Sequence, residues 1–259
     1  MQNQNAVLIE HMEDSLSPLE LRARAGYYQL LAGAFVEEPG GAYLAALRAP
    51  QALAELAELG LHFDADFTDV PLGELQDVLA CEYATLFTTA GGCPPVESSR
   101  LTGRFQQEPY HEVKAIYQRC GFELQPGRFA VFEDQLGIEL SFVAALLERL
   151  AEALEGDDAT AAGPLEKEIK RFWAIHLGRW VRGYSTLLER VTEHSFYREI
   201  ARLLRDFAEA ELALLKVRVD DVDGGREVVP KSEIQVLFNP NEPVCGGCEH
   251  GKDEKRAIA

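Results

Sequence analysis

The residues best suited to bind a metal lie near the C-terminus, in the run Cys245-Gly246-Gly247-Cys248-Glu249-His250. Two thiolates separated by two residues can share a zinc ion, and His250 could supply a third ligand. Structural zinc normally has four protein ligands, and the sequence offers no second cysteine pair at such spacing. The run therefore supplies only half of a metal site. It is also compatible with a redox dithiol, or with a C-terminal tail that binds no ligand.

Two histidines elsewhere invite the same question. Glu108 and His111 have E-x-x-H spacing, but a di-metal site needs two such pairs and two further carboxylates on facing helices. Pro109 suits the start of a helix, so we expect an ordinary surface pair here. His176 lies between Trp173 and Trp180 on an apolar helix face, which favours a hydrogen-bonded core histidine over a metal ligand.

Motifs that would indicate an enzyme are missing from the sequence. It contains no glycine-rich phosphate loop, no G-x-S-x-G and no H-E-x-x-H. We therefore expect a protein without catalytic activity or cofactor. A nucleotide-responsive switch is a further possibility, but the sequence contains no phosphate-binding motif.

Composition narrows the class of partner. The chain has 259 residues, 47% hydrophobic and 26% charged, with a net charge of −18. An acidic surface repels nucleic acid and attracts cationic segments. The sequence shows neither a secretory signal nor an apolar run long enough to span a membrane, and five scattered cysteines fit free thiols in a reducing compartment. These features predict a cytoplasmic protein without stable membrane insertion.

Apolar residues recur at helical spacing along most of the chain. A serine N-cap, a proline and a glutamate at Ser17-Pro18-Leu19-Glu20 predict the first helix. Further helices are predicted after Gly41, from Pro50 to about Gly60, from Pro71 to Phe87, around 113–120, over 136–154 at the centre of the protein, from Pro164 to Leu187, and over 196–215. Residues 88–104 have loop composition, and 156–163 read as a linker.

These elements predict an all-α fold, a single-domain helical bundle with an irregular C-terminal tail. Its expected parts are a flexible N-terminus over 1–16, a helical domain over 17–216 and a charged tail over 217–259. The tail opens with short β-like alternation and a turn signal at Asp223-Gly224-Gly225.

Three segments resemble motifs of the TorD/DmsD/NarJ family of redox-enzyme maturation chaperones. The first is Glu82-Tyr83-Ala84-Thr85-Leu86-Phe87, followed by Pro94-Pro95-Val96-Glu97-Ser98. The second is Glu133-Asp134-Gln135-Leu136-Gly137-Ile138-Glu139-Leu140, similar to the family's E-x-D-H-x-x-x-E-L signature. The third joins His176-Leu177-Gly178-Arg179-Trp180 to Phe196-Tyr197-Arg198-Glu199-Ile200-Ala201. Gln135 replaces the histidine usual in the second motif, so a role that needs a titrating group is in doubt there.

The resemblance implies a chaperone of the TorD/DmsD type. It would bind the twin-arginine signal peptide or another N-terminal segment of the catalytic subunit of a molybdopterin-containing oxidoreductase, assisting folding and cofactor insertion before export. It would act as a monomer or a homodimer. By match to the motifs, client-binding residues are Leu86, Phe87, Pro95, Ser98, Asp134, Gln135 and Glu139. Leu86 and Phe87 can equally be core residues, and Asp134 a helix cap.

Two alternatives remain open at this point. A NarJ-like assembly chaperone would serve a reductase that is not exported. A metal- or thiol-active protein would use Cys245, Cys248 and His250.

Overall fold

The first of the described helices begins where its capping sequence predicts. In the computed structural model, which describes residues 16–89, 91–125 and 131–225, α2 spans Pro18–Phe35. The Ser17 side chain accepts a hydrogen bond from the Glu20 amide, and the Glu20 carboxylate accepts from the Ser17 amide at 2.7 Å. This reciprocal pair satisfies two amides that the helix itself cannot bond. The described residues all fall in one compact unit, Met1–Val228.

The remaining elements confirm an all-helical fold. After α2 come α3 (Gly41–Leu47), α4 (Pro50–Glu58), α5 (Ala65–Thr68), α6 (Leu72–Tyr83), the π-helix η1 (Ala84–Thr88), α7 (Glu97–Thr102), α8 (Glu108–Arg119), α9 (Leu136–Glu155), α10 (Ala159–Ile175), the 3₁₀-helix η2 (Leu177–Arg179), α11 (Val181–Val191) and α12 (Ser195–Leu214). No strand occurs over the residues described, only a single antiparallel bridge between Val96 and Gln135.

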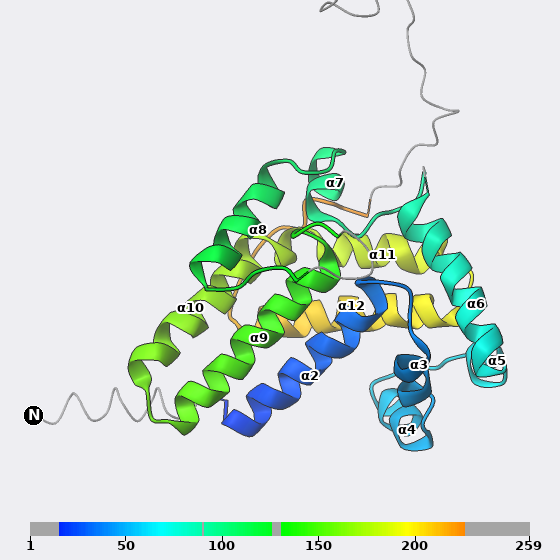
Figure 1. Cartoon of the computed structure of the whole chain (residues 1–259), viewed down its shortest axis with the longest axis horizontal. Coiled ribbons are helices and arrows are strands. Elements are labelled where there is room, and N and C mark those ends of the chain that lie inside the picture. The colour runs from blue at the N-terminus through cyan, green and yellow to red at the C-terminus, as the bar shows by residue number, and fades with distance from the viewer. Residues whose placement is uncertain (1–15, 90, 126–130, 226–259) are drawn as a thin grey trace, which may run out of the picture. The chain divides into compact units, whose positions relative to one another are not determined.

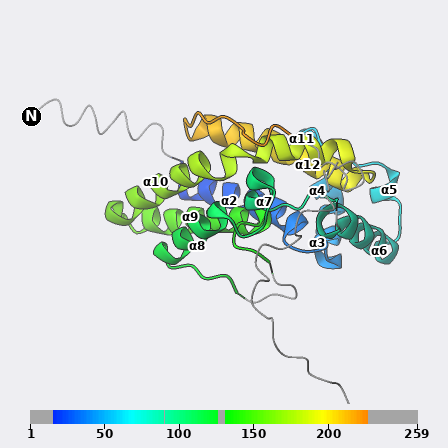
Figure 2. The same cartoon turned by 90° about the horizontal axis from the view of Figure 1, so that it is seen from above.

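Helix α9 lies at the centre, as the long apolar stripe over 136–154 predicts. It packs against α2 along one side and α10 along another, while α11 pairs with α12 (Figure 1). Seen from above, the same pairing of α11 with α12 is evident (Figure 2). Gly137 permits the close crossing of α9 and α2, because a Cβ there would lie 2.5 Å from the Val36 side chain and 3.0 Å from the Ala32 carbonyl.

The core is rich in large aromatic residues. Trp173, Trp180, Tyr28, Tyr184 and Tyr197 are all fully buried. The Trp173 indole donates a hydrogen bond to the Tyr28 hydroxyl at 2.6 Å, which gives a buried polar group its partner. None of the helices over the described residues is long and apolar enough to cross a membrane.

Two sequence predictions about the helices after α9 are wrong. Residues 156–163 are not a linker, because Asp158 caps α10 by accepting from the Thr160 and Ala161 amides at 3.1 Å, and Pro164 lies inside that helix. The apolar stripe from Pro164 to Leu187 is not one helix either. The chain turns at His176, whose φ of −123° and ψ of −95° are not helical, and continues through η2 into α11.

The loop predicted over 88–104 also contains a helix, α7, and α5 was not predicted at all. The partner that caps α7 comes from a residue more than thirty positions away along the chain, Asp134, so local composition could not reveal it. Gly103, at φ +78°, ends α7 in the left-handed conformation that glycine adopts readily.

Candidate functional site

The segment around α7 is fastened to the start of α9 by backbone hydrogen bonds. The Glu97 amide donates to the Asp134 carbonyl at 2.9 Å, and the Leu136 amide donates to the Pro95 carbonyl at 2.8 Å. These two bonds form the antiparallel bridge between Val96 and Gln135. Two of the three sequence motifs therefore meet in space.

Asp134 caps α7 across this junction. One carboxylate oxygen accepts from the Ser98 amide at 2.8 Å, at the N-terminal end of α7, where helix amides lack partners. Burial raises the pKa of the Asp134 carboxyl, an effect that the Ser98 hydrogen bond opposes. The carboxylate holds a helix end that the sequence treated as a loop.

Gln135 joins the end of α2 to the start of α9. Its amide nitrogen donates to the Phe35 carbonyl, while its side-chain oxygen accepts from the Ile138 amide at 3.1 Å. An amide side chain can do both at once, because it carries a donor and an acceptor without changing charge. Gln135 thus caps α9 and ties it to the end of α2.

Three carboxyl groups are buried together beneath α7. Glu97, Asp134 and Glu139 are each 0% exposed. Glu97 Oε2 lies 2.8 Å from Nδ1 of the equally buried His176, which confirms the predicted hydrogen-bonded core histidine. We call these four residues the acidic cluster.

Glu139 is the least compensated member of the acidic cluster. Within the described part of the chain neither of its oxygens makes a well-formed hydrogen bond, although the Glu97 carboxyl and the Trp180 indole lie close to it. Burial, followed by the charges of Glu97 and Asp134, raises the pKa of Glu139 well above its ordinary value. Burial and the neighbouring acids therefore favour the neutral, protonated form of this group.

Other polar atoms around the acidic cluster also lack a well-formed hydrogen bond. They are Oε1 of Glu97, Oγ of Ser98, Oδ1 of Asp134, Nε2 of His176 and Nε1 of Trp180. Buried polar atoms in native proteins are usually paired, so this concentration marks the region as unusual. Across the described ranges, no group of three or more His, Cys, Asp or Glu side chains is arranged to hold a metal ion.

A surface pocket of about 490 Å³ lies between α6–η1 and the turn joining α11 to α12. Its apolar lining includes Val78 and Val191, which are 44% and 40% exposed, together with Leu86. Its acidic lining comprises Asp66, Glu82 and Glu193. We call this the acidic–apolar pocket.

The π-helix η1 shapes one wall of the acidic–apolar pocket. The Cys93 amide donates to the Leu86 carbonyl at 2.6 Å, and a Cβ on Gly92 would lie 2.5 Å from the same oxygen. Glycine at 92 therefore lets the following loop close tightly on η1. π-turns inside helices are frequent at functional sites.

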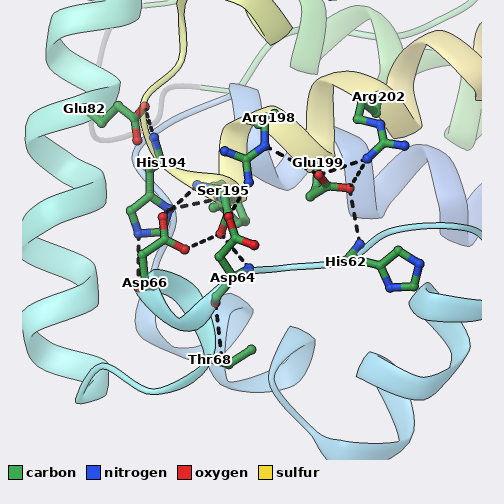
Figure 3. A network of polar contacts seen from close by, with 11 residues as sticks. His62, Asp64, Asp66, Thr68, Glu82, His194, Ser195, Arg198, Glu199 and Arg202 are labelled. Atoms are coloured by element: carbon green, nitrogen blue, oxygen red, sulfur yellow. Dashed lines mark hydrogen bonds and ion pairs between the residues drawn. The ribbon is translucent and has the colours of Figure 1, made fainter.

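A polar network extends from the pocket residues Asp66, Glu82 and His194 (Figure 3). Glu82 accepts from the amides of Glu193 and His194 at 3.0 and 3.1 Å, which joins α6 to the start of α12. Asp66 accepts from the Ser195 amide at 2.9 Å and also from its hydroxyl. Although burial opposes it, the Ser195 hydrogen bonds lower the pKa of Asp66, so this carboxylate is charged at neutral pH.

The structure buries all seven residues that the motifs assigned to client binding. They are Leu86, Phe87, Pro95, Ser98, Asp134, Gln135 and Glu139. Five of them meet at the junction of α7 and α9. Phe87 packs among Phe35, Tyr83 and Tyr197, and Leu86 alone of the seven lines the acidic–apolar pocket. Their direct contact with a client stays a prediction.

Several residues of interest had no signal in the sequence. Asp66, Glu193 and His194 come from α5 and the α11–α12 turn, outside the motif residues assigned to client binding. Only their meeting in space identifies them. Glu108 and His111 are both exposed, in keeping with a surface pair. Cys245, Cys248 and His250 lie outside the described residues.

Comparison with known proteins assigns this all-helical chain to a family. Residues 46–184 match the model of the family described as nitrate reductase delta subunit. The chain therefore belongs to this family, which comprises chaperones of the NarJ and TorD type, and the resemblance drawn from the motifs is confirmed. The match includes α6, α7, α9 and all seven motif residues assigned to client binding.

Two further comparisons add little. A solved structure described as a redox enzyme maturation protein from Archaeoglobus fulgidus shares 18% identity, covering 75% of this chain and 95% of that one, with a TM-score of 0.41. This likeness is too distant to bear on function. A search of curated proteins gives no match.

Proposed function

We propose that this chain is a chaperone, without catalysis of its own, that binds the signal peptide of a molybdenum-containing oxidoreductase subunit. It holds that segment in the cytoplasm during folding and cofactor insertion, before export. Family membership supports the chaperone class. The observation that carries the choice of ligand is the acidic–apolar pocket.

The chemistry of the pocket matches that of a signal peptide. Such a peptide has a basic region followed by an apolar helix, and an amphipathic helix binds by laying its apolar face in a groove. Val78, Val191 and Leu86 supply apolar contact, while Asp66, Glu82 and Glu193 supply negative charge for the basic region. The net charge of −18 steers such a cationic segment toward the chain.

The motif residues then act from behind the pocket. Leu86 lines it directly, and the Cys93 amide bonded to the Leu86 carbonyl ties this wall to the loop that leads to α7. Asp134 and Gln135 fix the far end of that loop through α7 and α9. Their substitution would alter binding by moving the wall rather than by removing a contact.

Calorimetric titration with a synthetic twin-arginine signal peptide tests the proposal. Glu193→Lys should weaken binding at least about tenfold, about 1.4 kcal/mol, with a loss that shrinks at high salt. Val191→Ser should weaken binding to a similar degree without that salt dependence, because it removes apolar area. Glu58→Lys is the matched control, since Glu58 is an exposed acid on α4 outside the pocket.

Equal losses for Glu193→Lys and Glu58→Lys would contradict a specific pocket and leave only long-range attraction. Melting temperatures of all variants should stay close to that of the parent chain, because every substituted residue is exposed.

The family description favours a second candidate, an assembly chaperone for a nitrate reductase that is not exported. Both candidates use the same pocket but differ in the client's N-terminus. Affinity purification of the tagged chain from its native cells, with mass spectrometry of the bound proteins, separates them. A client with a twin-arginine signal supports the first, and a client without one supports the second.

A further inference from the structure

The residues after α12 form an extended segment that is closely seated on the helices. Val217–Gly225 contain no helix or strand, yet they follow α11 and bond to it repeatedly. The Val222 amide donates to the Arg179 carbonyl, and the Arg182 guanidinium donates to the Val219 carbonyl, both at 2.7 Å. Arg190 donates to the Gly225 carbonyl at 2.8 Å. We call Lys216–Gly225 the strap.

The seat of the strap depends on two glycines. A Cβ on Gly178 would lie 2.7 Å from the Val219 side chain, and a Cβ on Gly183 would lie 2.7 Å from the Asp221 carboxylate. Asp221 in turn accepts from the Gly183 amide at 2.8 Å, near the start of α11. At both positions a side chain larger than glycine's would collide with the strap, so the two glycines allow the strap to pack closely on the helices.

One buried ion pair connects the strap to α7. Asp223, at 0% exposure, accepts from the Arg100 guanidinium at 2.8, 3.1 and 3.3 Å. The same guanidinium lies over the Tyr184 ring, 5.5 Å from its centroid. The Tyr184 hydroxyl donates to the Cys93 carbonyl at 3.0 Å, at the beginning of the loop that leads to α7.

Helix α7 is therefore held at both ends by different parts of the protein. Asp134 and His176 hold its first turn, through Ser98 and Glu97. Asp223 of the strap holds its second turn, through Arg100. Because α7 has only six residues, it is too short to be stable without these tethers.

We propose that the strap controls α7: while Asp223 binds Arg100, α7 stays closed over the acidic cluster, and release of the strap frees α7 and changes the affinity for the client peptide. The second half of this inference rests on the proposed function. The first half concerns the position of α7 alone. That half rests on geometry, because α7 contacts the acidic cluster through its first turn and the strap through Arg100.

Hydrogen–deuterium exchange of the full-length chain tests the first half without any client. The informative amides are those of Arg100 and Gly103, which donate to the Val96 and Ser99 carbonyls within α7. Asp223→Asn should accelerate their exchange at least about tenfold while the amides of α2 and α9 keep their rates. Asp220→Asn is the matched control, because Asp220 is an exposed acid on the same strap.

A milder variant guards against general destabilisation by Asp223→Asn. Arg190→Ala removes the bond to the Gly225 carbonyl and leaves no buried charge unpaired, so it should accelerate the same amides to a smaller extent. Unchanged α7 exchange in both variants would overturn strap control. Acceleration spread evenly over α2, α7 and α9 would also overturn it, because the ion pair would then be an ordinary part of the core.

Titration of the same proteins with the twin-arginine peptide tests the second half. We expect at least a threefold change in affinity for Asp223→Asn and none for Asp220→Asn. Peptide binding by the parent chain with identical affinity in Asp223→Asn would overturn regulation by the strap. If the parent chain binds no peptide, the proposed function fails, while the exchange rates still decide whether the strap holds α7.

Discussion

Two groups of acidic side chains differ in how the fold pairs them: the acidic cluster is fully buried, whereas the network of Figure 3 extends from the buried Glu199 to the exposed Asp64. In the acidic cluster, Glu97, Asp134 and Glu139 are fully buried, and only Glu97 contacts the histidine. In the network of Figure 3, the acids face arginines, a histidine and backbone amides. Arg198 lies 2.6 Å from Asp64, and Arg202 lies 3.0 Å from Glu199.

The two groups of acids differ in whether each carboxyl group has a partner that balances its charge. The network of Figure 3 pairs its carboxylates with arginines, a histidine and backbone amides, and these contacts hold α5, α6 and α12 together. In the acidic cluster, burial raises the pKa of Asp134 and of Glu139, so it opposes the charged forms of these two groups. Since α7 covers it, the cluster makes this region sensitive to anything that moves α7.

Removing the one base of the acidic cluster should have the largest effect. His176→Leu leaves Glu97 buried without its partner, which should lower the free energy of unfolding by about 3–5 kcal/mol. Urea unfolding followed by circular dichroism measures this. The double variant Glu97→Leu/His176→Leu should recover at least about 1 kcal/mol, because it removes the buried carboxyl group left without its partner. Equal losses in single and double variants would show that packing, rather than charge, matters here.

The helices could be predicted from the sequence more fully than the acidic cluster could. The capping box at Ser17 and the stripe along α9 are local patterns, and the structure confirms them. The end of α10 at His176 and the existence of α7 depend on Gly178 meeting the strap and on Asp134 capping from a distance. No window of neighbouring residues contains that information.

The same reason limits what could be predicted of the site. The motifs placed Asp134, Gln135 and Glu139 in one region, and they do lie together. Their burial depends on α7, which the sequence read as loop, so a surface role was the natural expectation for residues beside a loop. The pocket residues Asp66 and Glu193 belong to no motif, and only the fold brings them to Leu86.

The protonation of Glu139 gives the next largest effect, one that depends on pH. Its pKa is raised in the folded chain above the ordinary 4.5, so the folded state binds the proton more tightly than the unfolded state. Stability from this group is complete below pH 4.5 and is lost as pH rises toward the folded pKa, by up to about 1.4 kcal/mol per pH unit.

Glu139→Gln removes this dependence, because glutamine does not titrate. At neutral pH the variant should be more stable than the parent chain by roughly 1–3 kcal/mol, and the advantage should vanish near pH 4. Paired urea titrations across this pH range measure the difference, in which titrating groups distant from Glu139 cancel. A variant less stable at every pH would mean that Glu139 is ionised and partnered in the folded chain.

The smallest effect should come from an exposed ion pair in the network of Figure 3. Arg198 and Asp64 form an ion pair whose side chains are 33% and 66% exposed, so water and salt screen it. Arg198→Ala should cost less than about 1 kcal/mol in low salt and close to nothing at 1 M salt, where screening acts within about 3 Å. Urea unfolding at both salt concentrations measures this. A salt-independent loss above about 2 kcal/mol would place this network with the buried cluster, since only poorly screened charges behave in that way.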